Sequence, residues 1–233
     1  MLGLTLRLTG IFSFFRIPYN SLLMDTYLFP PKTTVIGMIG AAIGWNEDEF
    51  LENIKNFRYG LIIENHGEVL TETAAIYKSK EAPRYPITKN MVYMPVYKVF
   101  LSSKDDNMVK EAHDAIRDPK FVLTLGDSEN LFYPTHTNPN FVTLLEIKEK
   151  PAEKLNCILP SDIYNEYHST FSRIKDDFLP PRETKIPVDF VGKGRSRRFV
   201  PLNVFYYSGV ELRLKKPIKK GVFDFDGDAV YLF

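Results

Sequence analysis

The sequence predicts an α+β protein, and three observations lead to this fold class. The chain opens with an alternating apolar and polar stretch, MLGLTLRLTG at 1–10, which is typical of a half-buried strand. A double proline then precedes the apolar, glycine-containing stretch Val35–Ile43, which predicts a helix. Several predicted strands follow, and the last two form a hairpin around Asp226-Gly227. This order of elements favours the split βαβ arrangement of ferredoxin-like domains.

The predicted first helix has clear start and stop signals. Pro31 suits the first turn, because its missing N–H would be unpaired there in any residue. Thr33 and Thr34 are candidate N-caps, and Gly44 is a plausible C-terminal stop. A second short helix is expected over 46–57, with an asparagine as its cap.

The remaining elements are assigned from alternation, turns and breakers. Strands are expected at 59–64, 68–77, 96–101, 121–125, 141–147, 156–159, 203–214, 222–225 and 229–233. The turn at 65–67 is expected to join the first two of these strands as a hairpin. A polar helix is expected over 104–118. Irregular segments are expected at 10–23 and 78–94, and a loop-rich segment with some helix is expected at 160–187.

Composition and cysteine use define the class of protein. The 233 residues are 44% hydrophobic and 25% charged, which is ordinary for a globular chain with a core. Cys157 is the single cysteine, so an internal disulfide is impossible and a zinc cluster is not expected. A run of about 18 apolar residues is absent from the sequence, so we expect no transmembrane helix and no membrane partner. We expect a cytoplasmic protein with no cofactor.

Positive charge is concentrated late in a chain whose formal net charge is only +1. Between Arg182 and Lys220 there are eleven basic and three acidic residues, so this segment carries +8 and the rest of the chain is net acidic. Such asymmetry predicts an anionic partner held by one region.

The glycines of the first helix need an explanation, because each costs roughly 1 kcal/mol relative to alanine. Gly37, Gly40, Ala41 and Gly44 share one helix face, at spacings of three and four. A smooth face of this kind predicts close approach of another element, and tight packing of the helix on the sheet is the simplest interpretation.

The first turn of this helix is a candidate anion site. Lys32, Thr33 and Thr34 lie where free backbone N–H groups and the helix dipole favour a phosphate. A plain capped helix is the alternative. The order of a phosphate-binding P-loop is absent.

A second candidate site is the stretch VGKGRSRRF at 191–199. Gly192 and Gly194 would let backbone N–H groups approach phosphates, and four cations supply charge: Lys193, Arg195, Arg197 and Arg198. The stretch 78–98 mixes cations, among them Lys80 and Arg84, with tyrosines, which suits RNA or a neighbouring protein. A solvated basic loop and an ordinary surface loop are the respective alternatives.

Three stretches resemble the CRISPR-associated Cas-five family. TYLFPPKTTVIGMIGAAIG at 26–44 is similar to its N-terminal signature, an aromatic-Pro-Pro-Ser/Thr-Thr stretch leading into a glycine-rich helix. GIFSFFRIP at 10–18 resembles the loop before that signature, and FVLTLGDSENLF at 121–132 resembles a second signature. The three occur in the expected order, whereas the last 100 residues match only in general character.

The resemblance implies a fold and a function. It implies a RAMP-superfamily, RRM-like ferredoxin domain at 1–150, with a β-thumb inserted at about 78–98, and a β-rich region with the basic loop at 151–233. Such proteins cap one end of a type I Cascade complex in antiviral defence and bind the 5′ handle of CRISPR RNA. They contact a backbone subunit of the Cas-seven family and the large subunit. The expected RNA-binding residues are Arg16, Lys32, Thr33, Thr34, Lys80, Arg84, Lys193, Arg195, Arg197 and Arg198.

Two other functions remain open. One branch of the family cuts precursor CRISPR RNA without metal, using a tyrosine, lysine and histidine set, so a metal-independent endoribonuclease is the main alternative. Neither His168, which lies near Tyr164 and Tyr167, nor the other histidines can be matched to that set, so no catalytic residue is expected. A small α+β protein whose basic tail docks an acidic protein is the third interpretation. The alternating aspartates at 224–228 are better explained by turn chemistry than by a metal.

Overall fold

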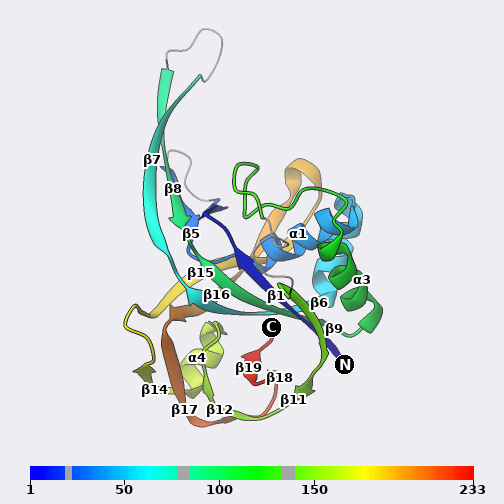
Figure 1. Cartoon of the computed structure of the whole chain (residues 1–233), viewed down its shortest axis with the longest axis vertical. Coiled ribbons are helices and arrows are strands. Elements are labelled where there is room, and N and C mark those ends of the chain that lie inside the picture. Colours follow the sequence, from blue (N-terminus) through cyan, green and yellow to red (C-terminus); the bar gives the residue numbers. More distant parts are fainter. Residues whose placement is uncertain (19–22, 78–83, 133–139) are drawn as a thin grey trace.

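A seven-stranded sheet organises the molecule (Figure 1). The computed structural model describes residues 1–18, 23–77, 84–132 and 140–233. Four strands, each antiparallel to its neighbours, lie in the order β10-β1-β9-β6. Next to β6 comes β16, running parallel to it, and β13 and β15 both pair with β16. The seven strands are β1 Leu2–Thr9, β6 Phe57–Asn65, β9 Val96–Ser103, β10 Val142–Glu146, β13 Leu159–Pro160, β15 Leu179–Val191 and β16 Arg198–Ser208.

Helices α1 and α3 cover one face of this sheet (Figure 1). The described residues form α1 Lys32–Ile43, α2 Glu47–Asn53, α3 Asp106–Arg117 and α4 Ser161–Tyr167, with a 3-10 turn at Ile54–Asn56. In α3, helical spacing places Val109, Ala112 and Ile116 on the buried face. In the described part of the chain, no helix combines the length and apolar character needed to span a membrane.

The predicted ends of α1 are correct at one end only. Gly44 caps the helix in the left-handed conformation at φ 93° and donates its N–H to the Gly40 carbonyl, as expected. At the other end the N-cap is Pro31, without a side-chain hydrogen bond. The expected threonine caps are wrong, because Thr33 and Thr34 lie inside the first turn.

The glycine face of α1 packs on residues just beyond the C-terminal end of the helix, not on the sheet. A Cβ built on Gly40 would lie 3.0 Å from Trp45, and one on Gly37 would lie 4.0 Å from Phe50. The expectation of helix-on-sheet packing through these glycines is therefore wrong. The short α2, capped by Asn46 as predicted, folds back on this smooth face.

A long hairpin projects from the body, made of β7 Glu68–Tyr77 and β8 Arg84–Tyr93 (Figure 1). The predicted pairing of 59–64 with 68–77 is wrong, because β6 pairs with β9 and β7 with β8. The predicted irregularity of 78–94 is also wrong over the described part, since β8 is regular. Its Pro86 is tolerated because β8 has a second neighbour only closer to the body, at β2 and β4.

Two small sheets form a second layer below the other face of the main sheet (Figure 1). One has the order β12-β17-β14 and the other the order β11-β18-β19. Their bounds are β11 Lys148–Glu149, β12 Ala152–Leu155, β14 His168–Arg173, β17 Val210–Ile218, β18 Val222–Phe225 and β19 Asp228–Tyr231. Four two-residue strands complete the list: β2 Phe12–Ser13, β3 Phe15–Arg16, β4 Leu23–Met24 and β5 Thr26–Tyr27.

The C-terminal predictions have mixed outcomes. The closing hairpin β18–β19 is confirmed. The helix expected within the loop-rich segment 160–187 is confirmed as α4, but the loop-rich part is wrong, because the stretch also holds β14 and part of β15. The single strand predicted at 203–214 is two strands separated at Gly209, whose φ of 65° breaks the extended backbone. The predicted strand at 121–125 is reduced to one isolated bridge, from Thr124 to Leu131.

Hydrophobic cores lie on both faces of the main sheet. Leu4, Leu6 and Leu8 of β1 pack with the helices, as the alternation predicts. On the other face Phe100 packs against Phe225 of the closing hairpin, with ring centroids 5.0 Å apart. The main sheet draws strands from both sides of residue 150, and a domain boundary there stays a prediction.

Candidate nucleic-acid interface

The basic loop joins β15 to β16 and is exposed along its whole length. It contains a short 3-10 turn at Gly194–Ser196. Gly192 and Gly194 adopt positive φ angles of 81° and 53°, which other residues rarely take. The two glycines thus turn the backbone, and the 3-10 turn is closed by the Arg197 N–H donating to the Gly194 carbonyl.

Carboxylates of α2 hold this loop. One oxygen of Glu47 accepts hydrogen bonds from the Gly194 N–H at 3.1 Å and from Arg197 Nη1 at 3.2 Å. The Lys193 ammonium lies 2.6 Å from an Asp48 oxygen, and this hydrogen bond raises the pKa of Lys193. Two of the four predicted loop cations are therefore already paired with acids.

Two aromatic rings pack behind one cation of the loop. The Arg197 guanidinium lies over the Phe190 ring, 4.9 Å from its centroid, and Phe190 packs against Phe50 of α2 at 5.8 Å. The other two cations, Arg195 and Arg198, are exposed and form no ion pair within the described residues. Among the described residues, the loop thus presents two guanidinium groups without an ion pair beside one ammonium and one guanidinium that are paired with carboxylates.

The tip of α1 has a different environment. Thr33 is only 8% exposed, and Lys32 and Thr34 are half-buried. Burial lowers the pKa of Lys32, a shift that the nearby Asp189 carboxylate of β15 opposes. Asp189 lies in β15 only three residues before Gly192, so this strand links the helix tip to the basic loop, which contacts Glu47 and Asp48 of α2. The helix tip and the loop are therefore joined through the end of β15, where Asp189 faces Lys32 and Phe190 lies under Arg197.

The other predicted contacts lie at the projecting hairpin. Arg16 is exposed on β3, whose partner strand β5 lies near the foot of this hairpin. Arg84 begins β8 and pairs through its backbone with Tyr77, far from the body. Lys80 lies outside the described residues. The structure thus brings Arg16 and Arg84 to the hairpin but not to the basic loop.

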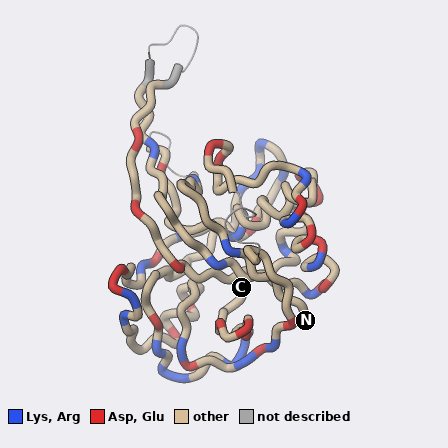
Figure 2. The backbone as a smooth tube through the Cα atoms, viewed as in Figure 1, with Lys and Arg blue, Asp and Glu red and all other residues tan. Residues whose placement is uncertain are grey.

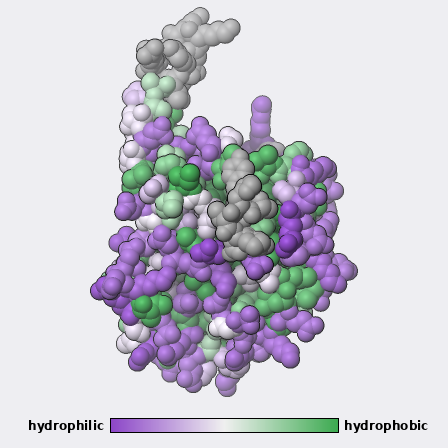
Figure 3. Space-filling view, viewed as in Figure 1, coloured by the Kyte–Doolittle hydropathy of each residue, from purple (hydrophilic) through white to green (hydrophobic). Residues whose placement is uncertain are grey.

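An apolar hollow of about 510 Å³ lies at the foot of the hairpin. Ile11 is 65% exposed and Met94 is 50% exposed at its rim. In Figure 3, apolar side chains gather where the hairpin joins the body. Lys89, which lies 4.7 Å from the Phe14 ring centroid, is neutralised there by Asp127 and Glu129.

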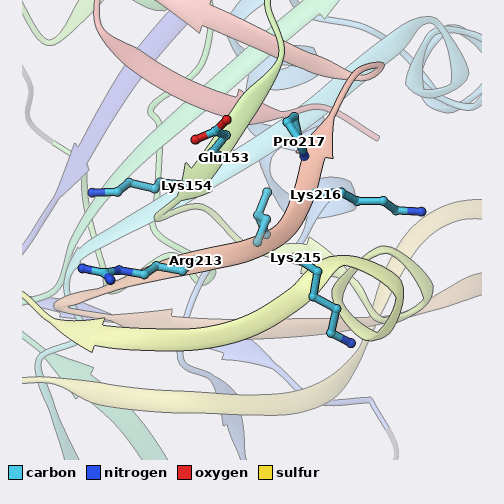
Figure 4. Close-up of a pocket in the computed structure, with 7 residues that line it drawn as sticks. Glu153, Lys154, Arg213, Lys215, Lys216 and Pro217 are labelled. Atoms are coloured by element: carbon cyan, nitrogen blue, oxygen red, sulfur yellow. The ribbon is translucent and has the colours of Figure 1, made fainter.

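Three further cations of the basic C-terminal segment, Arg213, Lys215 and Lys216, lie elsewhere, on β17. Figure 2 shows blue segments at the lower end of the molecule, where β17 runs. A hollow of about 340 Å³ there is lined by Glu153, Lys154, Arg213, Leu214, Lys215, Lys216 and Pro217. In Figure 4 Lys154 and Arg213 point one way and Lys216 points the other. Because the cations diverge, this hollow is a poor site for a single anion.

The candidate histidine and the alternating aspartates are part of packed or turn structures. The His168 ring stacks on Tyr164 at 4.5 Å, its Nε2 atom is buried, and burial lowers its pKa. Asp224 accepts the Gly227 N–H of the closing turn, and Asp228 is paired with Lys98. Within the described residues, no group of acids, histidines and cysteine could hold a metal ion.

The family model described as CRISPR-associated protein (Cas_Cas5) matches residues 3–182. This chain belongs to the Cas5 family. The match spans most of its length and confirms the family predicted from the sequence signatures. The matched residues include the helix tip and the projecting hairpin but end before the basic loop, so the role of the loop in this Cas5 protein depends on its own geometry.

Solved structures agree on the fold of this Cas5 chain. A chain of a "CRISPR RNA-guided surveillance complex" is 14% identical with a TM-score of 0.59, over 91% of this chain and 90% of that one. A CRISPR protein from Archaeoglobus fulgidus is 13% identical with a TM-score of 0.56, over 99% and 98%. A search of the curated proteins found no match.

The sequence did not reveal which residues of this Cas5 protein hold the loop. Glu47 and Asp48 read only as a favourable first turn of a capped helix. Their partners lie almost two-thirds of the chain away, and opposite charge was the one available signal. Phe190 was likewise missed, because an apolar residue in a strand carries no sign that it supports an arginine.

Proposed function

We propose that this Cas5 protein is a non-catalytic RNA-binding subunit of a type I Cascade surveillance complex, and that it holds the 5′ handle of CRISPR RNA. The observation that carries the proposal is the exposed loop between β15 and β16, whose glycine-shaped backbone presents Arg195 and Arg198 to solvent. A single-stranded handle needs such phosphate contacts. The family membership supports the setting, and the strand order β10-β1-β9-β6 supports a ferredoxin-like domain.

The projecting hairpin and its foot suit protein partners. In the proposed complex the hairpin acts as the family's thumb, with Arg84 at the start of β8. The apolar hollow beside Ile11 and Met94 is large enough to bury side chains of another subunit. We assign these surfaces to the backbone subunit of the Cas-seven family and to the large subunit.

An endoribonuclease would need an accessible general base. His168 lies near Tyr164 and Lys215, as a tyrosine, lysine and histidine set requires. Its buried Nε2 atom and its place in the stack over Tyr164 and Phe205 argue for a packing role instead. This geometry supports binding over cleavage.

One experiment separates these functions. Labelled single-stranded repeat-derived RNA is incubated with the purified protein and EDTA, and binding is measured between about 50 and 200 mM salt. We expect uncut RNA and an affinity that falls steeply with salt, because phosphate binding releases counterions. Cutting at one site would establish the endoribonuclease. Binding without salt dependence would favour docking to an acidic protein.

A further inference from the structure

The Glu47 carboxylate is bound by two donors of the basic loop. Its Oε1 atom accepts one hydrogen bond from a backbone N–H, that of Gly194, and one from the Arg197 guanidinium. A main-chain donor and a guanidinium converging on one oxygen are also the donors that a phosphate oxygen uses. Asp48 extends the same pattern to Lys193 at 2.6 Å.

The site is shaped independently of the carboxylate. The positive φ angles of Gly192 and Gly194 fix the turn that aims the Gly194 N–H. Arg197 is held from below by Phe190, whose ring is in turn packed on Phe50. Removing Glu47 would therefore leave these donors in place.

The ion pair between Glu47 and Arg197 is also weak enough for another anion to replace the carboxylate. The side chains of Glu47 and Arg197 are 44% and 39% exposed, and ion pairs so open to water contribute little. The acidic first turn of α2 stays favourable without the loop, because Asn46 and Glu49 cap it reciprocally. A ligand with several phosphates can thus displace the acids without unfolding either element.

We propose that the Gly194 N–H and Arg197 form a phosphate site, which the Glu47 carboxylate fills until an RNA phosphate replaces it. This inference rests on the proposed function and adds a self-competition to it, in which an acid of the protein competes with RNA phosphates for the same donors. Lys193 exchanges Asp48 for a phosphate in the same way. A single weakly bound anion gains little from the exchange, whereas an RNA strand that also engages Arg195 and Arg198 gains at several phosphates together. The acids of α2 therefore bias the free protein against weak, nonspecific binding.

The test is a double-mutant cycle on RNA affinity. The substitution Glu47→Gln keeps the size of the side chain but removes its charge, and we expect RNA to bind about threefold to fivefold more tightly. The matched control is Glu52→Gln, an exposed acid of the same helix that acts on Lys193 only through space and forms no ion pair with the described loop residues. It is expected to change affinity less than about twofold, because solvent screens its charge.

Measuring Glu47→Gln in an Arg197→Gln background shows whether the contact between Glu47 and Arg197 causes the gain in RNA affinity. In Arg197→Gln protein, Glu47→Gln should lose most of its effect. An equal gain in both backgrounds, or an equal gain from Glu52→Gln, would overturn the inference in favour of a general charge effect. Weaker binding by Glu47→Gln would also overturn it, by showing that the carboxylate organises the loop for RNA.

These outcomes are distinct from failure of the proposed function. If the parent protein does not bind repeat-derived RNA in a salt-dependent way, the proposed function fails. If it binds, Arg195→Ala weakens it, and Glu47→Gln has no effect, the handle-binding role stands and the self-competition is wrong.

Discussion

The tip of α1 and the loop between β15 and β16 both place cations beside backbone N–H groups, but they differ in exposure. Thr33 at the tip is 8% exposed, and burial lowers the pKa of its neighbour Lys32. The loop residues Arg195 and Arg198 are exposed. Lys32 is partly dehydrated and faces Asp189, so it is suited to a structural role. Arg197 is hydrated and lies over the ring of Phe190, so it is suited to exchange one anion for another.

This difference shows that a cation beside backbone N–H groups does not by itself identify an anion-binding site. The burial and the neighbours of the cation decide whether its role is structural or in binding. Tyr59 donates its hydroxyl to the Pro30 carbonyl at 2.5 Å, which fixes the chain entering α1 within the core. The loop is exposed, and its Arg197 lies over the ring of Phe190. We therefore expect the loop to contribute most to RNA affinity and α1 to contribute most to stability.

The largest expected effect concerns α1. Gly40→Leu forces a side chain against Trp45, where even a Cβ would lie at 3.0 Å, and should lower the free energy of unfolding by about 1–3 kcal/mol. Denaturant unfolding measures this change. Gly37→Ala is the matched control: its Cβ meets only Phe50 at 4.0 Å, so better helix propensity should stabilise the protein by up to about 1 kcal/mol. Full stability of the Gly40 variant would contradict the structural role of this face.

The next effect concerns the loop. Arg195→Ala combined with Arg197→Ala should weaken binding of repeat-derived RNA about tenfold or more, because two charge-assisted contacts are lost. The slope of log affinity against log salt should become shallower by about 1.4, in line with two fewer phosphates neutralised. The exposed pair Lys104→Ala with Lys110→Ala removes the same charge elsewhere and should leave the slope nearly unchanged. Equal effects of the two pairs would remove the distinction between the loop and the rest of the surface.

Alkaline pH should lower the stability of the core through the buried thiol of Cys157. Burial raises the pKa of Cys157 from 9.0 to about 12, so its contribution to stability is complete below pH 9 and is lost as pH rises toward 12. By pH 9.5 the loss should be about 1 kcal/mol, measured by denaturant unfolding. Cys157→Ala should flatten this part of the pH profile. An unchanged profile would show that the thiol does not titrate differently on unfolding.

The smallest effect is expected at the helix tip. Lys32→Met should lower RNA affinity by about threefold or less, because this ammonium is partly buried and close to Asp189. Stability should stay equal or rise, since the lowered pKa of Lys32 means that the fold disfavours its charge. Binding and unfolding are measured on the same preparation. A tenfold loss of affinity would reverse the ranking of tip and loop.

Local patterns predicted the fold best where they act within one element. The buried leucines of β1, the Asn46 cap, the Gly44 stop and the closing hairpin all follow from neighbouring residues. Strand pairing was predicted less well, because the turn at 65–67 gives no sign that its two strands belong to different sheets. The hairpin β7–β8 is inserted between paired strands β6 and β9, a long-range arrangement that alternation does not encode.

Prediction of the candidate site was limited in the same way, because its contacts also depend on long-range packing. Charge counting found the basic segment but not its division between the loop and β17, since consecutive strands enter different sheets. Spacing identified the glycines of the loop, and their positive φ angles agree. The pairing of Glu47 with Arg197 depends on how α2 and β15 pack, which no local pattern specifies.

The most direct test of the central claim is photo-crosslinking of thiouridine-substituted repeat-derived RNA to the purified protein, followed by peptide mapping. The account predicts that the dominant crosslinked peptide contains residues 192–199, with a minor share at the projecting hairpin, and that Arg195→Ala with Arg197→Ala reduces the dominant product. Crosslinks concentrated on the first turn of α1 or on β17, with the loop unmodified, would contradict it.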